Sequence, residues 1–258
     1  MMTDRPPPTV LVFAGLDPVG GAGLAADIET LAMQGCHAAP VATALTVQDT
    51  VGVHAIHAVD TTLVEQQARG VIDDMPVAAI KTGMLGSVGT VELVARLARD
   101  SGVPLIIDPV FASGGGTPLS GEPLDRTYMR SLLPHCLLAT PNTLEAAMLG
   151  RADDIDEQAQ AILSTGCQWL LITGTHEPGA DIVHRLYHDG RLQKTFRQPR
   201  LAGDYHGSGC TLASACAAGI AHGLPMETVV TKALAFTQAA LETAFSPGHG
   251  QSLPNRLP

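Results

Sequence analysis

The chain has 258 residues, 45% of them hydrophobic and only 3% aromatic, and a formal net charge of −10. This length suffices for one α/β domain that folds without disulfides or metals, so we expect a single domain over 1–258, with 1–8 flexible. Fifteen Lys and Arg residues against 25 Asp and Glu argue against a nucleic-acid partner, because phosphate backbones are held mainly by clustered cations. An anionic ligand would have to be bound mainly by backbone amides and helix N-termini.

The five cysteines are an odd number without CxxC pairs or zinc-like spacing, a pattern typical of reduced thiols in the cytosol. The first residues, MMTDRPPPTV, lack a positively charged region followed by an apolar stretch. No apolar run approaches the roughly 20 residues needed to span a bilayer. We therefore expect a cytoplasmic protein without a membrane partner.

The first predicted elements are a strand over 9–14, a glycine-rich loop and a helix. On that helix Leu24, Ile28 and Leu31 share one face, and Gly35 stands where a C-cap glycine is expected. Further strands are predicted from apolar runs at 37–46, 53–58, 77–81, 103–108, 136–140 and 169–173. Further helices are predicted at 88–99, 159–166, 211–222 and 226–244.

Strands alternating with helices predict a mainly parallel sheet, and ligands of such sheets bind beyond the carboxyl ends of the strands. Five loops would then share one rim: 15–23, 81–87, 108–118, 141–145 and 173–177. Residues 178–206 form a polar connection, although His184 and His188 fall in a strand-like stretch of it. Ten histidines without an HExxH pattern make a metal hydrolase a poor interpretation.

The strongest local signal is the turn formed by Gly207, Ser208, Gly209 and Cys210, which leads directly into a helical segment. Such a turn directs several amides into one concavity, where the helix dipole attracts an oxyanion or a transferring phosphoryl group. An ordinary Gly-Ser loop before a buried helix is the alternative. His206, just before the turn, either contacts phosphate or faces outward.

The earlier glycine-rich loop, Gly15 to Gly23, matches neither GxGxxG nor GxxxxGK[ST], so Walker-type phosphate binding is not predicted. Its glycines either let the main chain approach a flat ligand or simply form a tight turn. Asn142 and Glu145, three residues apart at a helix start, could organise a hydrated Mg²⁺ against nucleotide phosphates. The alternative for Asn142 is plain N-terminal capping.

Together these segments resemble the hydroxymethylpyrimidine and phosphomethylpyrimidine kinases of the ribokinase-like superfamily. The resemblance covers nearly the whole chain and rests on seven motifs in the family's order: GLDPVGGAG with Asp27 downstream, TALTVQDT, KTGMLGS, IDPV, TPNTLEA, ITGTH and HGSGCTLASA. It implies an α/β, three-layer ribokinase-like fold with a central, mainly parallel sheet flanked by helices. It also implies ATP and Mg²⁺ as cofactors, an aminopyrimidine substrate phosphorylated once and then again as its monophosphate, and a homodimer.

The resemblance also implies roles for individual residues. The turn at 207–209 corresponds to the family's anion hole and Cys210 to its proton acceptor, whose thiol pKa a helix N-terminus would lower. The substrate pocket would comprise Gln48, Gly15, Ala22, Asp27, Met84 and Val110, with Gln48 bonding the aminopyrimidine. The nucleotide side would comprise Asp108, Asn142, Glu145, Thr173, Gly174 and Thr175.

One departure from the family concerns FASGGGTPL, which has no Lys where many relatives carry one. Two alternative functions stay open on the sequence. One is a pyridoxal or pyridoxine kinase, which would use the same catalytic loops. The other is a pyrimidine-binding protein without catalysis.

Overall fold

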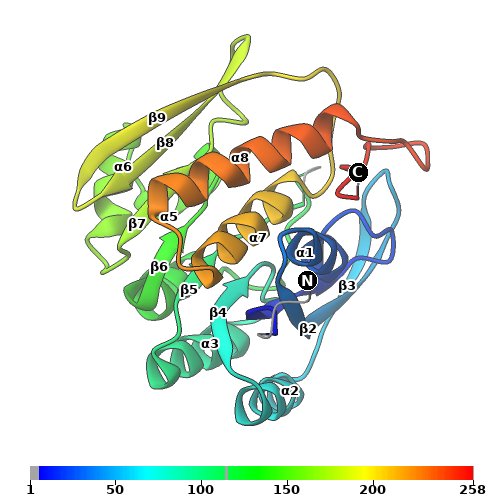
Figure 1. Cartoon of the computed structure of the whole chain (residues 1–258), viewed down its shortest axis with the longest axis vertical. Helices are drawn as coiled ribbons and strands as arrows, with labels where there is room; N and C mark the ends of the chain where they lie inside the picture. The colour runs from blue at the N-terminus through cyan, green and yellow to red at the C-terminus, as the bar shows by residue number, and fades with distance from the viewer. Residues whose placement is uncertain (1–5, 114–115, 258) are drawn as a thin grey trace.

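A nine-stranded sheet runs through the described part of the chain, residues 6–113 and 116–257 of a computed structural model (Figure 1). Its spatial order is β3-β2-β1-β4-β5-β6-β7-β8-β9. The strands are β1 (Thr9–Leu16), β2 (His37–Gln48), β3 (Val53–Ala58), β4 (Val77–Thr82), β5 (Leu105–Ile107), β6 (Cys136–Ala139), β7 (Trp169–Ile172), β8 (Asp181–His188) and β9 (Arg191–Pro199). Of the segment expected to be flexible, residues 1–5 lie outside the described ranges.

The centre of the sheet is parallel and its two ends are antiparallel. Strands β2, β1, β4, β5, β6 and β7 pair in parallel, whereas β3 pairs antiparallel with β2, and β8 with both β7 and β9. From β1 the order runs to β2 on one side and to β4 on the other. Such a reversal opens a crevice at the carboxyl ends of the two central strands.

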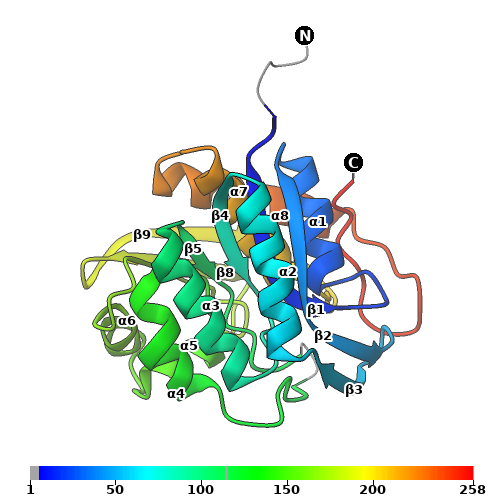
Figure 2. The same cartoon turned by 90° about the horizontal axis from the view of Figure 1, so that it is seen from below.

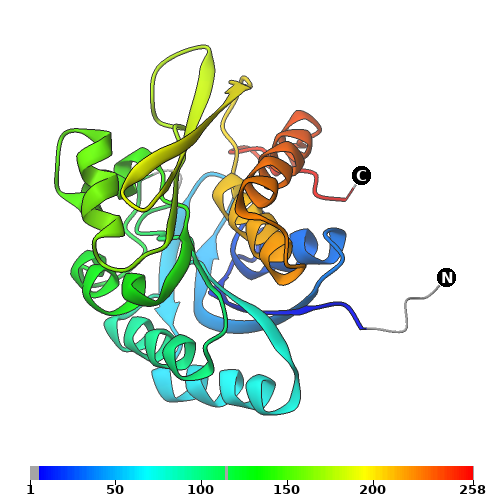
Figure 3. The same cartoon turned by 60° about the vertical axis from the view of Figure 1, so that its left-hand side comes forward.

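Helices cover both faces of the sheet. The helices are α1 (Gly23–Met33), α2 (Thr61–Asp74), α3 (Val88–Ser101), α4 (Asp125–Thr127), α5 (Thr143–Gly150), α6 (Ile155–Leu163), α7 (Ser208–Ala221) and α8 (Met226–Glu242). A π-turn at Tyr128–Leu132 and a 3₁₀ turn at Leu133–His135 connect α4 to β6. Helices α1, α7 and α8 form one outer layer, and α2, α3, α5 and α6 the other (Figures 2 and 3).

Strand β1 shows why the sheet is buried on both faces. Val10 and Val12 pack in the core beneath α1 and α7, while Leu11 and Phe13 pack in the core beneath α2 and α3. All four side chains are fully buried. Successive residues of a strand point to opposite faces, so a strand covered by helices on both sides is apolar throughout.

Most of the predicted elements are confirmed, but the helix expected at 159–166 lies at Ile155–Leu163, and three further details differ. Helix α2 was not predicted. The supposed connection 178–206 contains the β8–β9 hairpin. On α1, Ile28 is 41% exposed, whereas Asp27 is fully buried and occupies the inner face. Within the residues described, no helix is both long and apolar enough to cross a membrane.

Candidate active site

A cavity of about 700 Å³ opens at the carboxyl ends of the central strands. All five predicted rim loops contribute to its wall, as does the turn before α7. Its lining includes Gly15, Ala22, Gln48, Met84, Asp108, Val110, Asn142, Glu145, Thr173, Thr175, Gly207, Ser208, Gly209 and Cys210. Most of the site residues predicted from the sequence therefore line this one cavity.

Asp27 is the first exception, because it lies beneath the cavity. Its carboxylate is fully buried, accepts a hydrogen bond from Ser214 Oγ at 2.6 Å, and pairs with Lys81 Nζ at 2.7 Å. Its side chain points into the space between α1, α7 and β4, so it is not accessible to a substrate in the cavity. The assignment of Asp27 to the substrate pocket is therefore wrong for this structure, and the residue supports the cavity floor.

Gly174 is the second exception. It lies between Thr173 and Thr175 but is not part of the cavity lining. A Cβ at this position would overlap the carbonyl oxygen of Val183 on β8. Because Gly174 has no side chain, the backbone of its loop can approach the backbone of β8 closely. Its neighbours Thr173 and Thr175 line the cavity.

The turn before α7 leaves its amides open toward the cavity. Gly207 is the N-cap residue with φ +83°, and no side chain caps the helix. A Cβ on Gly207 would overlap the carbonyl oxygen of Gly21 and lie 2.9 Å from Arg256 Nη2, so a larger residue would not fit. The first amides of a helix have no intrahelical acceptor, so Ser208, Gly209 and Cys210 offer an anion-binding site.

Cys210 differs from the expected activated thiol. Burial raises the pKa of Cys210 to about 12, with Lys81 acting in the opposite direction and Asp108 and Asp27 adding to the increase. The neighbouring Cys210 thiol acts to lower the pKa of Asp108, against the larger effect of burial. The expectation that the helix N-terminus lowers the pKa of Cys210 is wrong here, because desolvation and two carboxylates outweigh the dipole.

Two carboxylates, Asp108 and Glu145, line the part of the cavity where the resemblance predicts the nucleotide. Burial raises the pKa of Asp108 to about 6, and burial with the neighbouring Asp108 raises that of Glu145 to about 8. Asp108 Oδ2 is buried without a hydrogen-bond partner. A pair of desolvated, mutually repelling carboxylates with an unsatisfied oxygen fits a divalent cation, because Mg²⁺ needs only one or two protein ligands beside phosphates and water.

Asn142 caps the N-terminus of α5. Its Oδ1 accepts hydrogen bonds from the amides of Leu144 and Glu145, both at 2.9 Å, and Glu145 Oε2 accepts from the Asn142 amide at 2.8 Å. This reciprocal capping box starts α5. The metal role expected for Asn142 is not supported by this geometry, and within the described residues no cluster of three ligands was found. Asp108 with Glu145 is the better-fitting pair.

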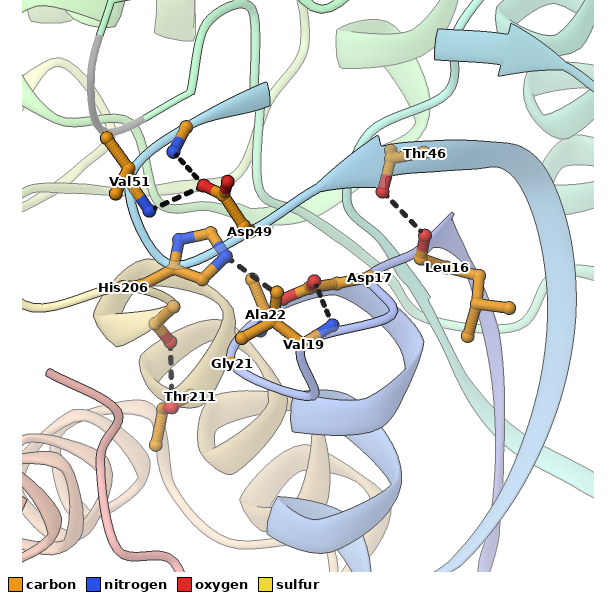
Figure 4. Close-up of polar contacts among 12 residues, drawn as sticks. Leu16, Asp17, Val19, Gly21, Ala22, Thr46, Asp49, Val51, His206 and Thr211 are labelled. Carbon is orange, nitrogen blue, oxygen red and sulfur yellow. Dashed lines mark hydrogen bonds and ion pairs between the residues drawn. The ribbon is translucent and has the colours of Figure 1, made fainter. Parts of the chain in front are cut away.

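The loop at 15–23 is organised around its own carboxylate, which the sequence did not single out. Asp17 Oδ1 accepts from the Val19 amide, and Oδ2 accepts from the Ala22 amide, both at 2.8 Å (Figure 4). Oδ2 also accepts from His206 Nε2 at 3.0 Å, so His206 faces this loop and not outward. These hydrogen bonds lower the pKa of Asp17 against the opposing effect of burial. The Asp-Pro pair inside a glycine-rich loop was the signal that could have identified it.

The neighbouring part of the cavity suits a flat ring. Met84 and Val110 belong to a small apolar cluster, and a Cβ on Gly15 would lie 3.3 Å from Met84 Sδ, so the glycine leaves room for the thioether. Gln48 ends β2 and is half-buried at the cavity wall. Apolar faces with one amide at the edge match a small aminated aromatic ring.

The segment at 111–119 lines the same side of the cavity. Its described lining residues are Phe111, Ala112, Ser113, Gly116 and Leu119, and positions 114–115 lie outside the described ranges. The sequence places no Lys in this segment. Phosphate charge must be compensated from elsewhere.

Comparison with known proteins agrees with this geometry. The phosphomethylpyrimidine kinase family model matches residues 17–255. The chain is 40% identical to a hydroxymethylpyrimidine/phosphomethylpyrimidine kinase of Streptomyces coelicolor, over 95% of this chain and 92% of that one. In structure it resembles an ADP complex of Bacillus subtilis pyridoxal kinase (TM-score 0.89, 26% identity, 96% and 97% coverage). It also resembles the phosphomethylpyrimidine kinase of Clostridium difficile (TM-score 0.77, 27% identity, 91% and 99% coverage). The chain therefore belongs to the phosphomethylpyrimidine kinase family and is a kinase of the ribokinase-like fold.

Proposed function

We propose that this kinase transfers the γ-phosphoryl group of ATP to 4-amino-5-hydroxymethyl-2-methylpyrimidine and then to the resulting monophosphate, for thiamine biosynthesis. One observation carries the proposal: the uncapped amides of α7 and the ring-sized site beside Gln48 open into the same cavity. The names of the sequence relatives support the same substrate. Phosphoryl transfer depends mainly on positioning and charge stabilisation, which this arrangement supplies.

In the first transfer the substrate hydroxyl oxygen attacks the γ-phosphorus, and the bond to the leaving oxygen of ADP breaks with its electron pair. The amides at 208–210 stabilise the charge on the transferred group. Cys210 Sγ accepts the proton of the attacking hydroxyl in its thiolate form, which the neighbouring Lys81 ammonium favours. Asp108 and Glu145 would hold Mg²⁺, which neutralises charge on the nucleotide phosphates.

Steady-state turnover with ATP and Mg²⁺ tests the proposal. We expect phosphorylation of the hydroxymethylpyrimidine and of its monophosphate, and much lower kcat/KM with pyridoxal and pyridoxine. A preference for pyridoxal would assign the activity named for the Bacillus subtilis neighbour. Binding of the pyrimidine without ATP consumption would identify a non-catalytic binding protein.

Assembly as a homodimer and a cytoplasmic location stay predictions. Light scattering after size exclusion measures the first, and fractionation of cells measures the second. A monomer at working concentration would contradict the dimer without affecting the kinase proposal, because all proposed site residues belong to one chain.

A further inference from the structure

We propose that His206 binds the phosphate of the substrate itself during the second phosphorylation and so determines whether the monophosphate is accepted. This inference rests on the proposed function, because it concerns the second of its two transfers. His206 lines the cavity and immediately precedes the turn at 207–210. The acceptor phosphate must lie between the pyrimidine ring and the γ-phosphate, and therefore beside this turn.

The imidazole of His206 is held in a fixed orientation. Its Nε2 donates to Asp17 Oδ2 at 3.0 Å, and its backbone amide donates to the Ser252 carbonyl at 2.9 Å. The ring lies against Gly21, where a Cβ would come within 2.6 Å of Cδ2 (Figure 4). The His206 side chain is 15% exposed, and within the described residues Nδ1 has no hydrogen-bond partner. This ring atom is left for a ligand.

The other basic side chains near the cavity are committed elsewhere. Arg200 lines the cavity, but its guanidinium donates to the carbonyl oxygens of Thr175, Glu177 and Gly179. Lys81 is fully buried in its pair with Asp27. These groups cannot turn toward an incoming phosphate without losing their present partners.

The remaining histidines of the cavity are placed less well. His184 is 5% exposed, and its Nε2 bonds Gln198 Oε1 at 3.1 Å. His176 belongs to the loop at 173–177, which follows β7 on the nucleotide side. Among the described lining residues, His206 is therefore the basic side chain adjacent to the turn.

The two transfers make different demands on the site. In the first, a hydroxyl must lose a proton. In the second, an oxygen of the phosphate dianion attacks the γ-phosphorus, a P–O–P linkage forms, and the electron pair of the breaking bond leaves with ADP, so no proton has to be removed. The monophosphate instead brings negative charge into a cavity that already contains Asp108 and Glu145. An imidazolium backed by the Asp17 carboxylate can donate Nδ1–H to that phosphate in a charge-assisted hydrogen bond.

The test compares the two substrates in His206→Gln, whose amide can still donate to Asp17 but carries no charge. Without ATP, calorimetric titration should show monophosphate affinity reduced about 10- to 100-fold and hydroxymethylpyrimidine affinity changed less than about threefold. In the kinase assay the ratio of kcat/KM for monophosphate to that for hydroxymethylpyrimidine should fall by a similar factor. His57→Gln, an exposed histidine on β3 outside the cavity, is the matched control and should leave this ratio unchanged.

Retained affinity for the unphosphorylated pyrimidine shows that the variant is folded, so the comparison does not depend on stability. Equal losses for both substrates, or no loss for either, would overturn the role of His206. A wild-type protein that binds neither pyrimidine would instead overturn the proposed function. The same measurements therefore separate the two failures.

Discussion

The loop at 15–23 and the turn at 207–210 are both rich in glycine, and both lead into the N-terminus of a helix. Their backbone amides differ in whether they have hydrogen-bond acceptors within the protein. In the loop, Asp17 accepts the amides of Val19 and Ala22, so an internal carboxylate occupies the place that an anion would take. Neither helix has a capping side chain, but in the turn Ser208, Gly209 and Cys210 themselves line the cavity, so their amides are open to a ligand.

The difference follows from one residue type. A carboxylate inside a glycine-rich loop satisfies that loop from within, which fixes its shape and excludes phosphate. A turn whose only side chains are a hydroxyl and a thiol leaves its amides for a ligand. We infer that the loop shapes the ring site while the turn performs the chemistry, and each prediction below tests one side of this division.

The largest effect is expected for Cys210→Ala, a substitution within the turn. Loss of the proton acceptor should reduce kcat for the hydroxymethylpyrimidine by about 10²- to 10⁴-fold. Affinity for both substrates, measured by titration calorimetry, should stay near that of the wild type because the amides of the turn are unchanged.

Cys210→Asp serves as the partner variant, since a carboxylate can also take the proton. It should retain more turnover than the alanine variant. Near-full turnover of Cys210→Ala with intact binding would show that the open amides and Mg²⁺ suffice for catalysis. Cys210 would then not be the proton acceptor.

Lys81→Met tests the buried contacts between the helix after the loop and the helix after the turn. Asp27 on α1 pairs with Lys81 and accepts a hydrogen bond from Ser214 on α7. Removing one partner of a fully buried ion pair typically costs about 3–5 kcal/mol of unfolding free energy, since the other charge stays buried. Urea unfolding monitored by circular dichroism measures this loss.

The double variant Asp27→Asn with Lys81→Met should recover most of that stability, because no uncompensated charge remains. Arg99→Met removes the exposed pair with Asp100 and should change stability by less than about 1 kcal/mol. A similarly small effect for Lys81→Met would mean that the buried pair between α1 and β4 contributes little to stability.

Glu145→Gln tests the cation site opposite the turn. Burial and Asp108 raise the pKa of Glu145 from 4.5 to about 8, so the folded protein holds a proton that the unfolded chain has released. Its contribution to stability is therefore complete below pH 4.5 and is lost as the pH rises through about 8. Thermal unfolding should show wild-type Tm falling relative to Glu145→Gln across this window.

The same variant should need about tenfold more Mg²⁺ for half-maximal rate, because an amide oxygen binds this cation more weakly than a carboxylate. Added Mg²⁺ should also raise Tm of the wild type more at about pH 8 than at about pH 5, where Glu145 is protonated. Identical Mg²⁺ dependence in both proteins would return Glu145 to its capping role alone.

The sequence predicted the parts of the fold that depend on local pattern. Apolar runs such as that at 9–14 identified the central strands, and the placement of loops after parallel strands correctly predicted a shared rim. The β8–β9 hairpin was missed as a pair of strands because β9 is largely polar and exposed, so it lacks the alternation of a half-buried strand. Helical spacing also misplaced Ile28, since burial of Asp27 depends on a lysine 54 positions away.

The site could be predicted where the residues that act together are consecutive in the sequence, as at 207–210. It was not predictable where partners are distant in sequence: Asp17 and His206 are 189 positions apart. Asn142 and Glu145 satisfied two interpretations equally well until their hydrogen bonds were known. The thiol pKa of Cys210 likewise depends on the burial and charges that the fold creates around it.

The smallest effect is expected for Gln48→Leu, on the side of the loop. Gln48 is only half-buried, so loss of one hydrogen bond to the aminopyrimidine should cost about 1 kcal/mol, or roughly fivefold in affinity. The loss should appear in pyrimidine titrations and in KM, while kcat and ATP affinity stay constant, because the turn and the nucleotide side are untouched. This pattern is the converse of the one expected for Cys210→Ala. If Gln48→Leu lowered kcat while leaving pyrimidine affinity unchanged, ring binding and chemistry would not be divided between the loop and the turn.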